Sequence, residues 1–484
     1  MAEGESQAVS HGAPQALPAA DAGIECPPMR VVLHVQDLSP RRQDIAIFLI
    51  TGAVGLVTGI LVSGYQSLIH YLRQGLLALG WLPANLALAP WWSVMLVPLL
   101  GGVGIGLLTR VLPPRYGAYG VSEVIRAVRG KRPPITFREA LAKVGLSAWT
   151  IGTGGSVGQE GPSVEVGAAV ANRIGAAFDL DARHCAILLA AGASAGIAAL
   201  FNAPLAGMAY AFEIVVAEIT LRTSSPIILA AVVGAAVAHA LGTGEVLTLP
   251  PYHFVVHRSW WFAVPVIAGL SLACALAAAL FTNSLRWMEV ALRHLPVPRS
   301  ALPPLGFAAL GGLLLLAPDV FGTGVSVVEA ALEEHLILEV MVGLLVAKIL
   351  ATSLTLAAGG VGGLFGPALF IGALTGGAYG MTLMLWTDQI PHYGLYAVVG
   401  MGVVLGTVIR APITATMIVF EVTGDYRLVI PLLVTTLFAI LLSRWMRHRS
   451  IYTGTIGIDP ESDPALQTLG FPRADGLTAP EDRW

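Results

Sequence analysis

The sequence predicts an all-α protein that crosses a membrane many times and is built from two related halves. The chain of 484 residues is 55% hydrophobic and 12% charged, with a mean hydropathy of +0.75, whereas a soluble protein carries about 25% charged residues. Residues 74–109, 259–285 and 349–387 contain no Asp, Glu, Lys or Arg. Each of these stretches is longer than the roughly 20 residues that a transmembrane helix needs. Landmark glycines and prolines also recur about 205 residues apart, which indicates two halves with the same fold.

Both ends of the chain are predicted to be cytoplasmic. Residues 1–43 are rich in Ala, Gly and Pro, lack the apolar core of a signal peptide, and end close to two arginines at 41 and 42. Residues 444–449, after the last apolar span, carry three more arginines. Positive charge marks the cytoplasmic flanks of membrane spans. Basic residues between 126 and 138 fit a cytoplasmic loop, and we expect a multi-pass protein of the cell inner (cytoplasmic) membrane.

An internal repeat divides the region between the tails. A glycine-rich pattern recurs after 205 residues: Gly154-Gly155, Gly158, Gly161-Pro162 and Gly167 return as Gly359-Gly360, Gly363, Gly366-Pro367 and Gly372. A second pattern recurs after 208 residues: Asn202 to Leu205 and Phe212-Glu213 return as Arg410 to Ile413 and Phe420-Glu421. Chance matching in a chain with 55 glycines is the alternative, but paired Gly-Pro and Ala-Pro landmarks in the same order argue against it. Transporters with inverted repeats place their sites where interrupted helices of the two halves meet. We expect a disordered tail over residues 1–43, repeats over 44–247 and 248–456, and a short cytoplasmic tail over 457–484.

The glycine-rich stretch 154–167 contains the strongest candidate for a functional residue. Glu160 is a lone carboxylate that follows the uncharged segment 144–159, and carboxylates within a membrane are functional candidates. Gly161-Pro162 predicts that a helix begins here, because proline is favoured at the first helical position. Free N–H groups at a helix N-terminus form an anion site. Glu160 would then occupy an anion site when ionised and leave it when protonated; the alternative is a glycine-rich helix contact whose carboxylate reaches water.

Several other classes of function lack support in the sequence. Net charge is −3 and no basic stripe indicates a nucleic-acid partner. The three cysteines and the eleven histidines show no metal-ligand spacing. An intramembrane enzyme would need a nucleophile with its base, or a metal cluster, and the glycine motifs supply neither. We therefore expect no enzymatic activity, no metal and no cofactor.

The motifs resemble those of the CLC family of chloride channels and proton-chloride antiporters. The stretch from Gly158 to Pro162 resembles the family's G[K/R]EGP motif, and the stretch from Gly363 to Pro367 resembles its GxFxP motif. Tyr452 resembles the family's tyrosine near the start of its last helix, and the stretches Phe201 to Gly207 and Arg410 to Pro412 also match. The similarity runs from about residue 44 to 456. It implies about 18 helices in two inverted halves, a homodimer with one anion pathway per subunit, and no CBS domains after the short C-terminus. It also implies that Glu160 is the gating glutamate and that Gly161, Leu364, Phe365 and Tyr452 contribute to the anion site.

Two departures from the family pattern concern the anion pathway. Tyr119 stands where the family's GSGIP motif has an anion-binding serine, in the local sequence from Ala118 to Ser122. A phenol donates one hydrogen bond but is far bulkier, so the backbone amides of Gly120 and Val121 are the alternative anion ligands. Gln159 replaces the basic residue before the gate, which removes a positive charge and should weaken anion steering.

A third departure concerns protons. The second, inner glutamate of the proton-coupled members falls on Ile214, which binds no proton. Glu213 lies on a neighbouring helix face and is a candidate inner proton route, although its repeat mate Glu421 suggests a structural role for both. Glu218, one helical turn past Ile214, is either an inner proton donor or a solvated residue at a helix end. Glu165 points to another side of its helix and is expected to pair with Lys143, because a lone buried charge is costly.

The sequence therefore predicts a CLC-like transport protein for chloride or a similar small anion, working within a lipid bilayer as a homodimer. The loss of the inner glutamate favours passive or weakly proton-coupled flux through the Glu160 gate. Stoichiometric proton-chloride antiport with another inner proton donor is the main alternative. A carrier for another anion is the third.

Overall fold

The computed structural model describes residues 40–81, 88–111, 120–128, 135–178, 180–216, 221–244, 260–387 and 392–446. These residues form sixteen α-helices, a π-helical segment at Ala211–Val216 (η3) and three short 3-10 segments, Arg299–Ala301, Pro318–Val320 and Tyr426–Leu428. Nine of the described helices are long and apolar enough to cross a membrane. The all-helical, membrane-spanning fold class is thus confirmed. The two predicted tails lie almost entirely outside the described residues.

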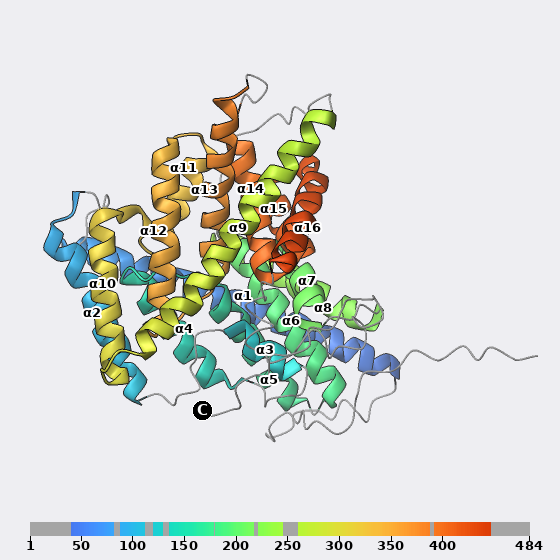
Figure 1. The fold of residues 1–484 in the computed structure, drawn as a ribbon. Coiled ribbons are helices and arrows are strands. Elements are labelled where there is room, and N and C mark those ends of the chain that lie inside the picture. The colour runs from blue at the N-terminus through green and yellow to red at the C-terminus, as the bar shows by residue number, and fades with distance from the viewer. Residues whose placement is uncertain are drawn as a thin grey trace, which may run out of the picture.

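The sixteen helices fall into two series of eight (Figure 1). The first series is α1 (Pro40–Ala78), α2 (Trp91–Val111), α3 (Gly120–Val128), α4 (Phe137–Gly152), α5 (Glu160–Ala177), α6 (Ala182–Phe201), α7 (Pro204–Tyr210) and α8 (Leu221–Ala240). The second series is α9 (Trp260–Arg293), α10 (Leu302–Leu316), α11 (Val325–Leu332), α12 (Leu338–Ala357), α13 (Phe365–Met384), α14 (Gly394–Ile409), α15 (Pro412–Thr423) and α16 (Val429–Trp445). Long and short helices follow one another in the same order in both series.

The local backbone repeats with the sequence. Asn202 and Arg410, 208 residues apart, both end a helix in the left-handed conformation, with φ of 52° and 57°. Gly154 and Gly359, 205 residues apart, have φ of 102° and 95° in the turns that follow α4 and α12. Such positive φ values are accessible to glycine without steric cost. The landmarks that revealed the repeat are therefore the residues that end and restart its helices.

Glycine pairs allow the central helices to approach each other closely. A Cβ placed on Gly167 of α5 would collide with the carbonyl of Gly192 on α6, and the reverse substitution gives the same clash. The second half repeats this contact between Gly372 of α13 and Gly400 of α14. Close packing of small residues is a main source of helix association within a membrane. These crossings fix the start of α5 and α13, where the candidate site lies.

We expect Gly192→Ala to destabilise the protein, because the added methyl group meets backbone atoms that have little room to move. Overpacking of this kind costs about 1–3 kcal/mol of unfolding free energy. The measurement is the thermal unfolding midpoint of the purified protein in detergent. Gly343→Ala in α12 is the control, since nothing lies within 4 Å of its added Cβ, and it should be neutral or stabilising. Equal midpoints for the two variants would contradict the close-crossing interpretation.

Candidate functional site

The two glycine-rich turns meet in an antiparallel backbone bridge. Gly158 N–H donates to the Gly363 carbonyl at 2.8 Å, and Gly363 N–H donates to the Gly158 carbonyl at 2.7 Å. This is the only β-type contact within the described part of the chain. The bridge joins the segments that lead into α5 and α13, so the N-termini of these two helices are held side by side. The expectation that interrupted helices of both halves meet is confirmed.

Threonine hydroxyls support the bridge with the symmetry of the repeat. Thr150 Oγ1 accepts a hydrogen bond from Val361 N at 3.2 Å, and Thr355 Oγ1 accepts one from Ser156 N at 3.1 Å. Thr150 and Thr355 are 205 residues apart, as are Ser156 and Val361. Each hydroxyl therefore satisfies a buried amide in the opposite half. These residues were not predicted from the sequence, although the same displacement of 205 residues reveals the pair of threonines.

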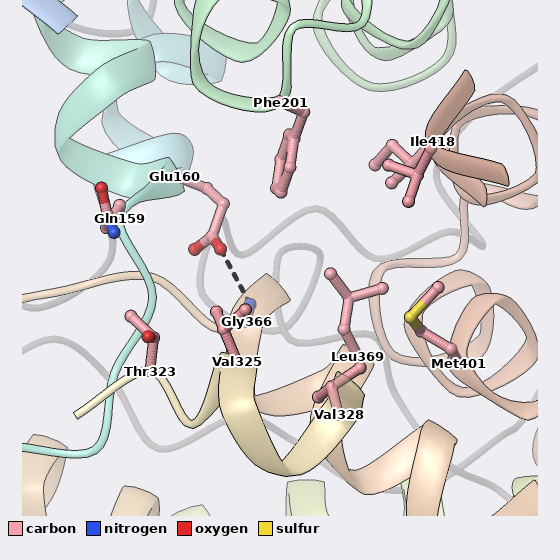
Figure 2. A pocket seen from close by; sticks show the side chains of 11 residues that line it. Gln159, Glu160, Phe201, Thr323, Val325, Val328, Gly366, Leu369, Met401 and Ile418 are labelled. Atoms are coloured by element: carbon pink, nitrogen blue, oxygen red, sulfur yellow. Dashed lines mark hydrogen bonds between the residues drawn. The ribbon is translucent and has the colours of Figure 1, made fainter. Parts of the chain in front are cut away.

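Glu160 reaches from the first half into the second. It is the first residue of α5 and is 3% exposed, and its Oε1 accepts a hydrogen bond from Gly366 N at 2.8 Å (Figure 2). Gly366 is the second residue of α13, so the carboxylate sits at that helix N-terminus, where a negative charge is stabilised. The tethered anion expected from the sequence thus lies on the helix of the other repeat.

The arrangement at the two N-termini is asymmetric. The repeat counterpart of Glu160 is Phe365, which has no group to reach back to α5. The ring of Phe365 is fully buried and packs edge-to-face on Tyr210 of α7, with ring centroids 6.0 Å apart. Gln159, at the N-cap position of α5, makes no side-chain cap hydrogen bond. One half therefore contributes a carboxylate to the other without receiving one.

A narrow, mainly apolar cavity borders the Glu160 carboxylate. The space open to the centres of water-sized molecules is about 40 Å³, and one water molecule needs roughly 10–15 Å³ of such space. Its walls come from α5, α6, α11, α13, α14 and α15 and are formed by Gln159, Glu160, Phe201, Thr323, Val325, Val328, Gly366, Leu369, Met401, Ile418 and Val422 (Figure 2). A small ligand fits beside the carboxylate, and the apolar walls make an uncompensated charge there costly.

The other residues expected at the anion site are partly brought together. Gly161 and Leu364 are buried at the starts of α5 and α13, next to Glu160 and Phe365. Gly120 and Val121 are buried at the N-terminus of α3. Tyr119 and Tyr452, together with Glu218, lie outside the described residues, so their predicted roles stay predictions.

The expected pairing of Lys143 with Glu165 is confirmed. Lys143 Nζ of α4 lies 2.5 Å from Glu165 Oε1 of α5, and the two side chains are 4% and 0% exposed. A Cβ on Gly120 would come within 2.6 Å of the same carboxylate oxygen. The pair therefore lies against the first residue of α3.

Glu213 has a structural partner across the repeat. Its carboxylate accepts hydrogen bonds from Ile413 N at 3.1 Å and from Thr414 N at 2.7 Å, at the start of α15. Glu421 in turn accepts from Leu205 N and Ala206 N at 2.8 and 2.6 Å, at the start of α7. Each carboxylate caps the helix that follows the Ala-Pro landmark of the other half. This agrees with the structural role that the repeat suggested for both residues.

Comparisons with known proteins agree with this architecture. The sequence model of the family described as voltage gated chloride channel matches residues 101–444. The chain belongs to the CLC family. A ClcB-like protein of Ralstonia nicotianae is 30% identical over 433 residues, covering 86% of this chain and 99% of the relative. An H(+)/Cl(-) exchange transporter, ClcA, of Vibrio vulnificus is 29% identical, covering 86% of this chain and 91% of its own length. The crystal structure of a slow cyanobacterial Cl-/H+ antiporter superposes with a TM-score of 0.74 at 25% identity, covering 87% and 98% of the two chains.

Against the CLC pattern, the residue that departs most clearly within the described region is Ile214. It lies in the π-helical segment η3 and is 9% exposed. The neighbouring carboxylate of Glu213 is engaged in capping α15. An apolar, buried side chain therefore stands where the CLC resemblance implies an inner glutamate.

We expect Gly158→Ala to move the Glu160 carboxylate off Gly366 without unfolding the protein. The added Cβ would clash with both carboxylate oxygens, which are the end of a flexible side chain. Gly161→Ala is the control, because its nearest atoms, in Gly362, are 3.8 Å away. A high-resolution structure of each variant measures the distance from Glu160 Oε1 to Gly366 N. An unchanged distance in Gly158→Ala would show that the carboxylate has another way to stay at α13.

Proposed function

We propose that this chain moves chloride, or a similar small anion, across the membrane through a pathway that Glu160 opens and closes. The observation that carries the proposal is the hydrogen bond between the Glu160 carboxylate and Gly366 N at the start of α13. The carboxylate occupies a place where a helix N-terminus binds an anion. A free anion and the ionised side chain compete for that place. The names of the relatives, an H(+)/Cl(-) exchange transporter among them, support chloride as the transported ion.

Protonation of Glu160 is the event that opens the pathway in this proposal. A neutral carboxylic acid has lost most of its attraction to the helix N-terminus, and its apolar surroundings accept the neutral form readily. A chloride ion can then take its place at the amides of α5 and α13. The flux should rise when the external pH falls.

We propose passive or weakly proton-coupled flux as the mode, because Ile214 removes the inner proton donor that the CLC resemblance implies. Stoichiometric proton-chloride antiport is the second candidate. It is favoured by relatives described as an H(+)/Cl(-) exchange transporter and a Cl-/H+ antiporter. The two modes differ in whether chloride efflux drives proton uptake.

The outer approach to the gate carries positive charge from another element. Gln159 lines a second pocket, of about 500 Å³ open to water-sized molecules, together with His70 and Arg73 near the end of α1. Because α1 begins beside the arginines at 41 and 42, its far end is expected on the outer side. We propose that Arg73 supplies the steering charge that Gln159 lacks. Both His70 and Arg73 are exposed to solvent, as an approaching anion requires.

We propose a homodimer in the cytoplasmic membrane with both termini in the cytoplasm. Support comes from the basic residues that flank the first and last spans, and from large apolar side chains exposed on helices α8 and α16: Ile228, Val232, Ile430, Val434, Leu437, Phe438 and Leu441. Lipid or a second copy of the chain would cover these side chains.

Glu160→Gln in liposomes tests the gate. A glutamine side chain keeps the size of the protonated acid but has no titrating group, so chloride flux should no longer rise as the external pH falls and should drive no proton movement across the membrane. The measurement is simultaneous recording of chloride efflux with a chloride electrode and of proton uptake with a pH electrode. In the wild type, proton uptake in fixed proportion to chloride would favour antiport, and little or no uptake would favour passive flux. A Glu160→Gln protein that keeps the full pH dependence, with its fold intact, would remove Glu160 from the gate.

Arg73→Gln should slow chloride entry from the outer side several-fold at low ionic strength, and the difference should shrink in high salt because screening weakens steering. Flux is measured from the initial rate over a range of ionic strengths. Arg427→Gln, an exposed arginine in the segment before α16, is the control. Gln159→Arg combined with Arg73→Gln should restore the rate. A rate equal to wild type in Arg73→Gln at every ionic strength would exclude the proposed steering role.

A further inference from the structure

We propose that Glu165 and Lys143 form a second proton-binding site, inward of the gate, whose protonation releases the Lys143 charge to attract an anion to the N-terminus of α3. The inference rests on the proposed anion transport and adds a proton site to it. The pair lies further along α5 than the gate, one carboxylate oxygen of Glu165 has no hydrogen-bond partner among the described residues, and the second repeat has a phenylalanine in place of Glu165.

The pair lies deeper along α5 than the gate. Glu165 follows Glu160 by five residues, which is about 7.5 Å along the helix axis. Asn172, further along α5, donates a hydrogen bond to the Ile135 carbonyl just before α4, at 3.2 Å. α5 therefore runs toward the side on which α4 begins. That side carries the basic residues 126–138 and is the predicted cytoplasmic face.

Lys143 binds only one of the two carboxylate oxygens of Glu165. Lys143 binds Oε1, while Oε2 is fully buried with no hydrogen-bond partner among the described residues. The carboxylate also lies against Gly120, the first residue of α3, because a Cβ added there would come within 2.6 Å of Oε1. In the first turn of the same helix, the hydroxyl of Ser122 is buried and likewise lacks a partner in the described chain. A helix N-terminus, an ammonium group and the carboxylate of Glu165, which has one unused buried oxygen, thus meet at Gly120.

The second repeat shows that the fold does not require a carboxylate here. The counterparts of Lys143 and Glu165, displaced by 205 residues, are Lys348 and Phe370. Lys348 Nζ donates to the carbonyls of Val320, Gly322 and Thr323 at 3.3, 2.8 and 3.1 Å, and lies 4.8 Å from the centre of the Phe370 ring. A buried lysine at this position is therefore satisfied by backbone carbonyls and an aromatic face. The carboxylate of Glu165 adds a titratable group that its structural twin does without.

The net charge of the Lys143 and Glu165 pair depends on whether Glu165 is protonated. With both groups ionised the pair carries no net charge. A proton that binds the Glu165 carboxylate gives a neutral acid, while the Lys143 ammonium keeps its charge and loses its counter-ion. The site then carries one positive charge beside the N-terminus of α3, and an anion compensates it. Proton and anion binding are thus linked, each favouring the other.

Other charged groups connect the pair to the inner face. Glu139 of α4 and Glu123 of α3 act electrostatically on Glu165 together with Lys143. Glu139 is partly exposed at the N-terminus of α4, one turn before Lys143 on the same helix face. Glu123 pairs with Arg126 at 3.5 Å, also partly exposed. These carboxylates offer protons a way from the inner solution to Glu165.

The test measures proton uptake on chloride binding by the full chain in detergent. Glu160→Gln serves as the background, because it removes the proton linkage of the gate. Chloride is titrated into weakly buffered protein at mildly acidic pH, with heat recorded by calorimetry and proton uptake by a pH electrode. We expect the Glu160→Gln protein to take up protons as chloride binds, and the Glu160→Gln, Glu165→Gln double variant to bind chloride with that uptake lost.

Two further variants keep the result interpretable. Glu165→Phe, in place of Glu165→Gln, copies the Lys348 and Phe370 arrangement and should also abolish the uptake if glutamine disturbs folding. Glu421→Gln in the Glu160→Gln background removes a helix-capping carboxylate elsewhere and should leave the uptake unchanged. Size-exclusion chromatography confirms the fold of each protein.

Chloride binding without proton uptake in Glu160→Gln, or equal uptake with and without Glu165, would overturn the second proton site alone. A wild-type chain that neither binds chloride nor passes it in liposomes would overturn the proposed function, and this inference with it.

Discussion

The structure depends on one backbone contact, the pair of hydrogen bonds between Gly158 and Gly363. Two helices that begin inside a membrane leave unpaired N–H groups at their N-termini, and each buried N–H group needs a hydrogen-bond partner. The bridge lets each half satisfy part of the other's backbone, and the hydroxyls of Thr150 and Thr355 continue the exchange. A Cβ at either bridge position meets the Glu160 carboxylate, so a side chain larger than glycine would displace this carboxylate from its place at α13. The two helix N-termini stay together because of this contact.

The symmetry of the scaffold makes its exceptions informative. The bridge, the threonines, the glycine crossings and the capping carboxylates Glu213 and Glu421 all occur twice. Glu160 and Glu165, in contrast, have Phe365 and Phe370 as their counterparts. Two carboxylates of α5 thus replace two phenylalanines of α13. A symmetric framework holds the helices, and the two carboxylates that we propose to bind protons lie in one half only.

Burial makes the ionised forms of Glu160, Glu165 and Lys143 dependent on a compensating partner. Glu160 lies beside a narrow cavity with apolar walls, and Glu165 meets Lys143 where neither side chain reaches water. In such surroundings an ionised group needs a compensating partner, so a change of one proton alters which partner it holds. Water would screen the same groups on the protein surface, and the exchange of a proton for an anion would have little effect. With Ile214 where the CLC resemblance implies an inner glutamate, the buried carboxylates Glu160 and Glu165 are the proton-binding groups that we propose.

The sequence alone determined the fold class and the repeat, and it predicted a candidate site at the glycine-rich helix starts. Uncharged stretches longer than a bilayer require membrane helices, and Gly-Pro and Ala-Pro landmarks fix where helices restart, since these residues have few backbone alternatives. The lone carboxylate of Glu160 and the pairing of Lys143 with Glu165 also followed from the cost of buried charge. Only the tertiary structure decided which helix each group serves. Glu160 binds the N-terminus of α13, Glu213 caps α15, and Glu165 touches α3. The partners of Glu160 and Glu213 are 206 and 201 residues away. Spacing along a chain carries no information about contacts that form only when two inverted halves pack together.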